Sequence, residues 1–392
     1  MKVLLLTSKP IYPVVDGGCF ASRQFLKTLL HAGADVRHLT IATDKHPFSE
    51  SDYPKDIHSA TQPKSVYINT AVRPVAALSS LIRGKSYNIR RFFALKMVHL
   101  IEETLADFKP ECVIFDGLYT TPYLEVIRKS HPGKIFLRSH NAEFKLWKKY
   151  ADEAKGIKRI YLKKLHRDLK KYECELLSQV DAIFALSSED ITVFQACNPE
   201  VKAHLVPVAI ETQDQPFVGT TNDFYHVGAM NWLPNIQAVK MLVDVFRNVR
   251  KRMPNADLHI AGLKSDTIVK SNEDKGIHVH GFVSDMDAFG KEHGTLVTPI
   301  LSGSGIRIKI LEAMALGKAV ITTPTGALGI DYHSQNCLIV AEQPEELEEK
   351  MIEILENPHL RQQIGENAFQ YIRDHHTIHD ISKQVIELLK SE

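Results

Sequence analysis

Short apolar runs alternate with longer amphipathic stretches along almost the whole chain, and this alternation constrains the possible folds most strongly. The apolar runs have the length of buried strands, and the amphipathic stretches between them have the length and period of helices. Strands that alternate with helices indicate α/β layers built on parallel sheets. Hydrophobic residues make up 44% of the 392 residues and charged residues 24%, which is the balance of a globular protein with room for two ordinary domains.

The strand and helix pattern runs through the first half of the chain and then starts again. In the first half, strands are predicted at 3–7, 36–42, 112–116, 135–139, 182–186 and 206–210, with a helix at 19–32. In the second half, strands are predicted at 224–227, 258–261, 278–282, 296–299 and 319–323, with helices at 235–253 and 378–390 and helix starts at Pro344 and Pro358. The polar segment Glu211 to Asp214, before Pro216, predicts a hinge between the halves. We therefore predict Rossmann-like domains at 1–210 and 211–375, and a final helix within 376–392 that packs back on the first domain.

Charge, cysteine usage and hydropathy exclude several classes of protein. The net charge of +1 argues against a dedicated nucleic-acid binder. The five cysteines show no C-x-x-C spacing, so they predict neither a zinc site nor a disulfide framework and favour a reducing compartment. The apolar start at Met1 to Leu6 is too short for a signal peptide, and no run approaches the roughly 20 apolar residues of a membrane-spanning helix. These features predict a cytoplasmic protein.

The run from Gly303 to Ala315 carries the strongest chemical signal. Two glycines, Gly303 and Gly305, precede an apolar helix whose start holds Arg307 and Lys309. Cations are disfavoured at the positive end of a helix dipole, so their presence there indicates that an anion normally occupies the site. Free amides, glycines and two cations together form a phosphate cradle, and Glu312 adds a carboxylate for sugar hydroxyls.

A tight turn and a surface ion pair are the alternative interpretation of the same run. The cradle also carries a geometric condition, because helical positions 307 and 309 would point about 200° apart. The two cations can converge on one ligand only if Arg307 belongs to the loop. The candidate motifs of this chain all follow the end of a predicted strand, where ligands bind to open parallel sheets, and this agreement favours the cradle.

The run resembles the donor-site segment of retaining, nucleotide-sugar-dependent glycosyltransferases of family 4, which have the GT-B fold. Glu312 and the following Ala313-Met314-Ala315 match the second half of the family pattern, whereas the first glutamate of the pattern would fall at Ser304. The resemblance implies two Rossmann-like domains that face each other across a cleft. It assigns acceptor binding to the first domain and nucleotide-sugar binding to the second. The serine at position 304 affects most directly the identity of the donor sugar.

Five further residues follow predicted strand ends. Gly17 and Gly18 open the first helix, where they can approach a phosphate or a sugar closely or simply form a loop. The resemblance implies that the glycine pair faces the donor diphosphate and that His140, after the strand 135–139, lies near the donor sugar. In the second half, Gly228 begins the first loop, and the resemblance implies that the backbone near Val283 binds the nucleobase.

No metal site is predicted. Asp285-Met286-Asp287 has the spacing of a D-x-D metal signature, but Ser284 and Asp285 are better placed to cap the next helix. In many members of the family an arginine and a lysine in the loop after position 228 hold the donor phosphates. Here Lys240 lies well inside the following helix, so Arg307 and Lys309 are expected to carry the phosphate charge alone.

These observations predict a metal-independent, hexosyltransferase-like enzyme without a cofactor, whose nucleotide-diphosphate sugar is a substrate. It would transfer the sugar with retention to a sugar or lipid-linked acceptor in glycan, polysaccharide or glycolipid biosynthesis. A nucleotide-sugar epimerase on the same fold and a non-catalytic nucleotide-sugar-binding partner subunit remain as alternatives, and a sugar phosphorylase is disfavoured because no lysine stands out for pyridoxal phosphate. The nucleobase, the sugar and the acceptor stay open.

A basic segment from Lys145 to Lys171 holds eleven Lys or Arg residues against three Asp or Glu residues. Its structural interpretation is a solvated helical face. Its functional interpretation is a dock for an anionic membrane leaflet or a phosphorylated acceptor, with Trp147 and Tyr150 among the residues that supply an apolar side. The second interpretation places the protein peripherally at the inner membrane face.

Overall fold

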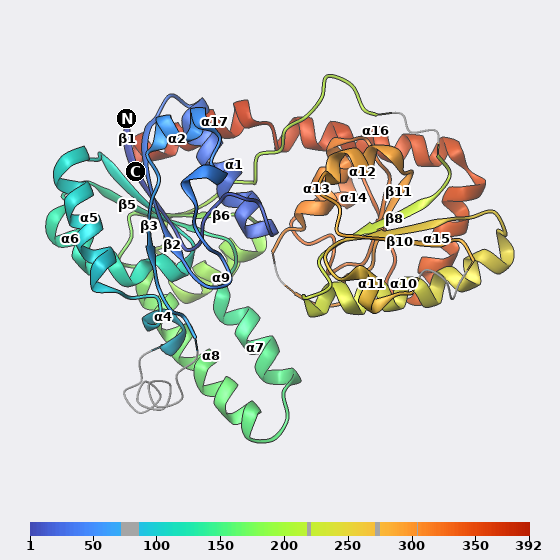
Figure 1. The fold of residues 1–392 in the computed structure, drawn as a ribbon, viewed down its shortest axis with the longest axis horizontal. Coiled ribbons are helices and arrows are strands. Elements are labelled where there is room, and N and C mark those ends of the chain that lie inside the picture. Colours follow the sequence, from blue (N-terminus) through green and yellow to red (C-terminus); the bar gives the residue numbers. More distant parts are fainter. Residues whose placement is uncertain (72–85, 218–220, 271–274, 304) are drawn as a thin grey trace. The chain divides into compact units, whose positions relative to one another are not determined.

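A computed structural model describes the chain except for residues 72–85, 218–220, 271–274 and 304. The described residues form two compact units, Met1–Ala209 with Ile378–Glu392, and Ile210–Thr377. The chain thus passes between the units twice, once directly before the polar segment 211–214 and once before the last helix (Figure 1). None of the described helices is both long and apolar enough to span a bilayer.

The first unit contains a parallel sheet of seven strands in the order β3-β2-β1-β4-β5-β6-β7. The strands are β1 (Lys2–Thr7), β2 (Asp35–Ala42), β3 (Lys64–Tyr67), β4 (Cys112–Asp116), β5 (Lys134–Ser139), β6 (Ala182–Ala185) and β7 (Ala203–Leu205). The helices are α1 (Gly17–His31), α2 (Lys55–Thr61), α4 (Tyr87–Arg90), α5 (Leu95–Phe108), α6 (Leu124–Ser130), α7 (Glu143–Glu153), α8 (Gly156–Leu176), α9 (Ser188–Cys197) and α17 (Ile378–Ser391).

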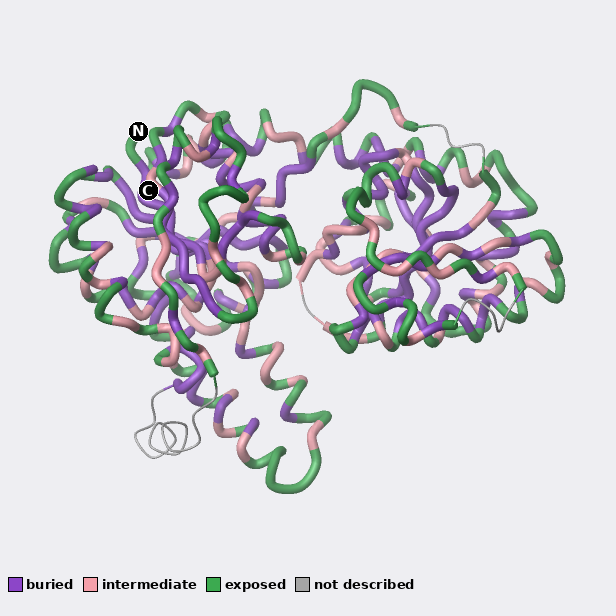
Figure 2. The backbone as a smooth tube through the Cα atoms, viewed as in Figure 1, coloured by how far each residue is buried: buried purple, intermediate pink, exposed green. Residues whose placement is uncertain are grey.

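Helices cover both faces of this sheet, which explains the continuous apolar strands. Successive residues of a strand point to opposite faces, so Val3 and Leu5 of β1 enter one core while Leu4 and Leu6 enter the other. The first core contains side chains of α1 and α2, and the second contains those of α5, α6, α8 and α9. Figure 2 shows the resulting buried strands between more exposed helices.

The last helix belongs to the first unit. Ile381, Val385 and Leu389 of α17 are buried in the core that contains β1, and Ser382 Oγ donates to Thr28 O of α1 at 3.1 Å. The apolar face of α17 is therefore covered by α1 and the sheet, although the two helices are far apart in sequence (Figure 1).

The second unit contains a parallel sheet of six strands in the order β10-β9-β8-β11-β12-β13. The strands are β8 (Phe224–Val227), β9 (Leu258–Ala261), β10 (Ile277–Gly281), β11 (Thr295–Thr298), β12 (Val320–Thr322) and β13 (Ile339–Val340). The helices are α10 (Leu233–Arg252), α11 (Ser265–Ile268), α12 (Met286–Glu292), α13 (Ile308–Ala315), α14 (Tyr332–Gln335), α15 (Pro344–Glu356) and α16 (Pro358–His375). As predicted, Asp285 caps α12 by accepting from Ala288 N at 2.9 Å.

The prediction of a strand at 206–210 is wrong. These residues are buried, but β7 ends at Leu205, before the run begins. Pro207 lacks an N–H for a sheet ladder, and the run instead leads to the unit boundary, where Ile210 N donates to His376 O at 2.8 Å. Val206 N still donates to Ala185 O of β6 at 2.8 Å, so the apolar character from Val208 to Ile210 reflects burial of a connection and not strand pairing.

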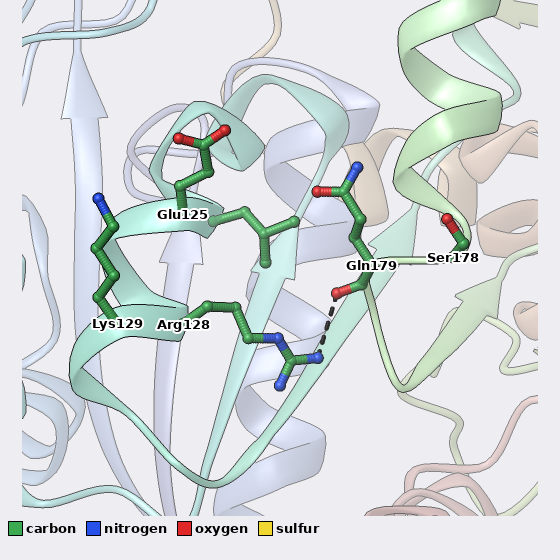
Figure 3. Close-up of a pocket in the computed structure, with 6 residues that line it drawn as sticks. Glu125, Arg128, Lys129, Ser178 and Gln179 are labelled. Carbon is green, nitrogen blue, oxygen red and sulfur yellow. Dashed lines mark hydrogen bonds between the residues drawn. The ribbon is translucent and has the colours of Figure 1, made fainter.

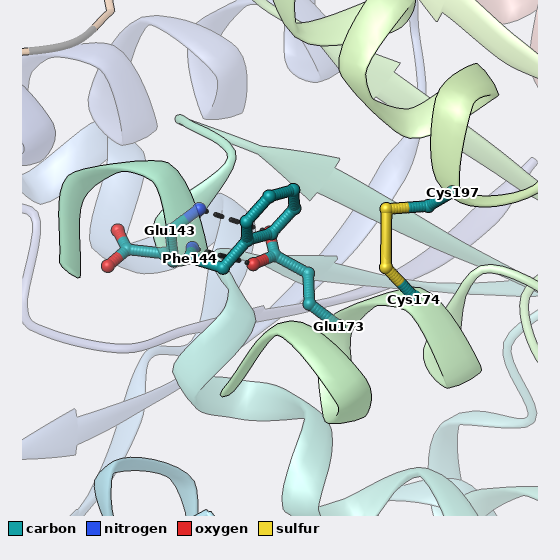
Figure 4. The surroundings of a disulfide bond; sticks show 5 residues. All are labelled: Glu143, Phe144, Glu173, Cys174 and Cys197. Carbon is teal, nitrogen blue, oxygen red and sulfur yellow. Dashed lines mark hydrogen bonds between the residues drawn. A yellow bond between two sulfur atoms is a disulfide. The ribbon is translucent and has the colours of Figure 1, made fainter. Parts of the chain in front are cut away.

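The expectation that no disulfide is present is also wrong. Cys174 of α8 and Cys197 of α9 are bonded, with their Cα atoms 5.4 Å apart (Figure 4). The two helices flank β6 along the chain and pack on one face of the sheet, which brings together cysteines whose sequence spacing gives no sign of pairing. Beside the bridge, Glu173 accepts from Glu143 N at 3.1 Å and Phe144 N at 3.0 Å, so α8 supplies the cap for the start of α7.

Candidate functional site

The loops after β8 and β11 meet at the topological switch point of the second sheet. β8 is the first strand of this unit and lies between β9 and β11, so the chain leaves it on one side and later returns on the other. In open parallel sheets, ligands bind at the carboxyl ends of the strands at such a point. Gly228 begins the loop after β8, and Gly303 and Gly305 lie in the loop between β11 and α13.

Lys309 links these two loops. It lies in the first turn of α13, and its Nζ donates to Val227 O at 2.6 Å and to Asn235 Oδ1 at 2.9 Å. A Cβ at Gly228 would lie 2.9 Å from Nζ and 2.7 Å from Asn235 Nδ2, so this approach requires glycine. Burial, and then the neighbouring Arg307, lower the pKa of Lys309 to about 7.

Arg307 lies directly before α13 and has an extended backbone, with φ −95° and ψ 100°. The geometric condition for convergence is therefore met, because Arg307 belongs to the loop. Its side chain is buried, with the guanidinium carbon 5.5 Å from the centre of the Trp232 ring. A Cβ at Gly303, whose φ is +116°, would lie 2.7 Å from Arg307 Nη2. Burial lowers the pKa of Arg307 to about 10.

The remaining predicted residues of the second unit surround this pair of cations or lie along the same sheet edge. Glu312 is exposed on α13, three positions after Lys309 and thus on a neighbouring part of the helix surface. Gly305 has φ +74°, a conformation that favours glycine. Val283 is half-buried in the loop after β10, two strands from β8. Strand spacing places the ends of β10 and β8 about 10 Å apart. Ser304 lies outside the described residues.

In the first unit, Gly17 and Gly18 form the start of α1. Gly18 lies close to Lys9, a residue that sequence reasoning missed. Lys9 Nζ contacts Asp16 Oδ1 at 2.6 Å and Oδ2 at 2.7 Å, and Asp16 also caps α1 by accepting from Cys19 N at 2.8 Å. A Cβ at Gly18 would lie 2.7 Å from Lys9 Nζ, so the glycine makes room for the ammonium group. Burial would raise the pKa of Asp16, but Lys9 outweighs it and the pKa falls to about 2.

His140 belongs to a buried ionic network at the ends of β4 and β5. Asp116 Oδ1 lies 2.7 Å from His140 Nε2 and 2.7 Å from Arg138 Nη1. Asp116 and Arg138 are fully buried, whereas the His140 side chain keeps 20% of its surface exposed. Burial alone would raise the pKa of Asp116, but Arg138 and His140 hold it well below its usual range.

This network fixes the orientation of the histidine ring. Nε2 of His140 lies 2.7 Å from the Asp116 carboxylate and 3.1 Å from Arg138 Nη1, and the shorter contact assigns the hydrogen to Nε2 and the lone pair to Nδ1 in the neutral ring. Sequence reasoning found His140 but missed Asp116 and Arg138 as its partners. The signal was present, since Asp116 is a charged residue at the carboxyl end of a buried strand, the same position that singled out His140.

A pocket in the first unit lies away from these residues. Figure 3 shows it between α6 and the turn after α8, lined by Leu124, Glu125, Arg128, Lys129, Ser178 and Gln179. Arg128 Nη2 donates to Gln179 O at 3.2 Å across it. The lining segments precede β5 and β6, so the pocket lies at the amino ends of the strands. The rule for parallel sheets places ligand chemistry at the opposite edge.

Comparison with known proteins agrees with this architecture. Residues 221–357 match the family model described as glycosyl transferases group 1. An uncharacterized 44.6 kDa protein in the cps region of Klebsiella pneumoniae is 23% identical, over 96% of both chains. Sucrose-phosphate synthase from Thermosynechococcus elongatus superposes with a TM-score of 0.71 at 14% identity, covering 100% of this chain and 98% of that one.

A third similar protein is Alr3699/HepE of Anabaena, solved in complex with UDP-glucose. It superposes with a TM-score of 0.66 at 15% identity over 100% of both chains. Each sheet of the present chain is parallel and covered by helices, as the GT-B fold requires. The chain therefore has the GT-B fold, and residues 221–357 of its second unit are similar to the group 1 glycosyl transferases.

Proposed function

We propose that this protein transfers a sugar, with retention of configuration, from a nucleotide-diphosphate sugar to a hydroxyl of a sugar or lipid-linked acceptor. The observation that carries the proposal is the pair of cations at the switch point, the buried Arg307 and the half-buried Lys309, whose pKa values are both lowered. Burial disfavours the charged forms of both side chains, and a bound anion would stabilise these forms. A diphosphate would supply that anion at the place where GT-B donors are expected.

The donor would be held by groups of the second unit. Arg307, Lys309 and the backbone of Gly303, Ser304 and Gly305 would bind the diphosphate, with Gly228 allowing close approach. Glu312 would accept hydrogen bonds from the ribose, and the backbone at Val283 would bind the base. The UDP-glucose complex of the Anabaena protein supports testing uridine nucleotides first.

The first unit would supply the acceptor side of the reaction. In the proposal, Gly17 and Gly18 face the diphosphate, and His140 lies near the transferred sugar. Asp116 holds Nε2 of His140 at 2.7 Å, which leaves Nδ1 to contact the sugar or the acceptor hydroxyl. This arrangement would orient substrate or move a proton, a type of contribution that typically accounts for about 100-fold or more in rate.

Charge that develops on the departing nucleotide would be neutralised by Arg307, Lys309 and helix amides. Loss of one such preorganised group typically costs about 100–1,000-fold in rate. Because the chain supplies this positive charge, we propose that transfer needs no metal ion. Turnover that persists in excess EDTA, per folded molecule, would support this part of the proposal, and turnover that returns only with added Mg²⁺ or Mn²⁺ would contradict it.

Donor binding and turnover by matched variants test the proposed site. We expect UDP, GDP or ADP to raise the melting temperature of the wild-type chain, and the corresponding nucleotide sugars to release nucleoside diphosphate. Arg307→Ala and Lys309→Met should each lower the rate about 100-fold or more, and Glu312→Gln should weaken donor binding about tenfold. Lys240→Met, which removes an exposed lysine of α10, should behave like the wild type.

The same assay separates the alternatives. A nucleotide-sugar epimerase would convert the donor sugar without any acceptor and without releasing nucleoside diphosphate. A non-catalytic partner subunit, which the serine at position 304 favours, would bind the donor and lose binding in Lys309→Met but never turn over. Nucleotide binding that is equal in the wild type, Arg307→Ala and Lys309→Met would contradict the site itself.

We also propose that α7 and α8 contact an anionic membrane surface on the cytoplasmic side. The two helices pack together as a hairpin that projects from the first unit, and residues 155–160 at its turn are exposed (Figures 1 and 2). Ile157 and Ile160 expose 86% and 72% of their surface among Lys155, Lys158 and Arg159. Exposed isoleucines ringed by cations match a surface that binds acidic lipids.

Vesicle co-sedimentation tests the membrane contact. The wild-type chain should sediment with vesicles of phosphatidylglycerol and phosphatidylcholine but not with phosphatidylcholine alone. The double variant Ile157→Ser and Ile160→Ser should lose most of this binding while keeping its melting temperature, because both side chains are already exposed. Equal sedimentation of the wild type and the double variant would contradict the proposal.

A further inference from the structure

Three histidines of the second unit converge although they are far apart in sequence. His259 lies on β9, His280 on the neighbouring β10, and His293 directly after α12. Each can place a ring nitrogen within 4.8 Å of the ring nitrogens of the other two. His259 Nδ1 lies 3.0 Å from His280 Nε2, and the rings of His259 and His293 stack with their centres 4.0 Å apart.

Asp223 fixes the most buried of these rings. His293 Nδ1 donates to Asp223 Oδ2 at 2.7 Å, while Asp223 Oδ1 accepts from Gly294 N at 2.6 Å. His293 is 7% exposed, and within the described part of the chain its Nε2 is buried without a hydrogen-bond partner. In the neutral ring, with the hydrogen on Nδ1, Nε2 presents a lone pair. A buried lone pair with nothing to accept costs free energy, so a ligand for it is expected.

A carboxylate that orients a histidine through one nitrogen and leaves the other for coordination is typical of zinc sites. Imidazole nitrogens favour Zn²⁺ among the common divalent ions of cells, and hard cations such as Mg²⁺ prefer oxygen. Zn–N bonds of about 2.0–2.1 Å in a tetrahedron place nitrogens about 3.3 Å apart. The His259–His280 separation is already close to this value. His280 is exposed, so its ring has room to turn and the ion has a route of entry.

Asp223, His259 and His293 lie away from the carboxyl strand ends of the donor site, whereas His280 is near the carboxyl end of β10, three residues before Val283. Asp223 precedes β8 and His293 precedes β11, so both lie at the amino ends of strands whose carboxyl ends lead to Gly228 and Gly303. The ring of Phe289 on α12 packs against His293 at 4.4 Å and against His280 at 5.1 Å, and thus covers one side of the cluster. An ion at this place would tie the edge strand β10 and its neighbour β9 to the segment before β11.

We infer that His259, His280 and His293 bind one Zn²⁺ ion, with water as the fourth ligand and Asp223 as the carboxylate that positions His293. The other group of potential ligands in the described residues, Asp16, Cys19 and His46, is different, because Lys9 already contacts both carboxylate oxygens of Asp16. The ion would be structural, and donor chemistry would not pass through it.

Zinc content and cobalt spectroscopy of the untagged full-length chain test this inference. After removal of metals with EDTA and titration with ZnCl₂, the desalted wild-type protein should retain one zinc ion per chain by atomic emission. Co²⁺ should give the visible absorption bands of a tetrahedral site, and Zn²⁺ should abolish them. Asp223→Asn should weaken zinc binding about 10–100-fold.

Matched variants keep the test decisive if one of them fails to fold. His280→Ala removes an exposed ring and should lose the zinc while its circular dichroism spectrum stays unchanged; His293→Ala should lose the zinc as well. His359→Ala, on the exposed surface of α16, should bind zinc like the wild type. The inference is overturned if the wild-type chain binds no more zinc than His280→Ala, or if His280→Ala and His293→Ala both retain the ion.

Discussion

Both units hold charged side chains at the carboxyl ends of their strands, but the neighbours of these side chains differ in charge. In the first unit, Asp116 contacts Arg138 and His140 at 2.7 Å each. In the second, Lys309 donates to two neutral acceptors, Val227 O and Asn235 Oδ1, and has a second cation as its neighbour. The first arrangement pairs opposite charges within the chain, whereas an anionic ligand would stabilise the charged form of Lys309.

The pKa shifts express this difference. A lowered pKa of the acid Asp116 means that its charged form is stabilised, since Arg138 and His140 outweigh the cost of burial. A lowered pKa of the base Lys309 means that its charged form is destabilised by burial and by Arg307. A lowered pKa therefore identifies Asp116 as a group whose charge stabilises the first unit, and Lys309 as a group whose charge destabilises the second unit.

The largest effect that this comparison predicts is on the stability of the first unit. Asp116→Asn keeps the side-chain volume but leaves Arg138 as a buried cation without its carboxylate, so the free energy of unfolding should fall by about 3–5 kcal/mol. Urea denaturation followed by circular dichroism measures it. Asp152→Asn, an exposed carboxylate on α7, should change the value by less than about 0.5 kcal/mol. A loss below about 1 kcal/mol for Asp116→Asn would break the comparison.

His140→Ala sharpens the comparison by separating catalysis from folding. The ring is partly exposed, and Arg138 still pairs with Asp116 in its absence, so the fold and donor affinity should be retained. Turnover should fall about 100-fold. Initial rates of nucleoside diphosphate release, with donor affinity from calorimetry, test this expectation. An unchanged rate would show that His140 belongs to the fold alone.

Lys309→Met, in the second unit, should change the free energy of unfolding in the opposite direction to Asp116→Asn, because it removes a charge that burial disfavours. The pKa of Lys309 is lowered from 10.5 to about 7, so between these values the unfolded chain binds more protons and the wild type gains stability as pH rises. Relative to the wild type, the ligand-free variant should therefore have its highest free energy of unfolding near pH 7 or below. Above pH 7 this relative free energy of unfolding should fall by up to about 1.4 kcal/mol per pH unit. Urea denaturation at about pH 7 and pH 9 measures the difference, and a difference independent of pH would contradict the shift.

The strands inside each sheet follow from the sequence, and the strands at the edges do not. β1, β4 and β5 read as continuous apolar runs because helices cover both of their faces. β3 and β7, at the two edges of the first sheet, are short and only partly buried, so neither carries such a run. The apolar run lies instead in the buried connection at 206–210, because a residue is apolar where it is buried, whether or not it pairs in a sheet.

The candidate site divides in a similar way. Residues that follow strand ends, such as His140 and Arg307, can be found from the sequence because topology brings strand ends to one edge of a sheet. Asp116 also ends a strand, but its pairing with His140, and the pairing of Asn235 with Lys309, depend on tertiary packing that no local pattern records. The Cys174–Cys197 bond and the three clustered histidines depend on tertiary packing in the same sense.

Proton uptake on donor binding tests the central claim most directly. At about pH 8 the ammonium form of Lys309 is a minority in the free protein, because its pKa is about 7. A diphosphate beside it would raise that pKa, so titration calorimetry in Tris and in HEPES should report nearly one proton taken up per nucleotide sugar bound. The uptake should vanish in Lys309→Arg, which keeps the charge without titrating in this range. Donor binding with no proton uptake by the wild type, or with equal uptake by Lys309→Arg, would contradict a diphosphate at this lysine.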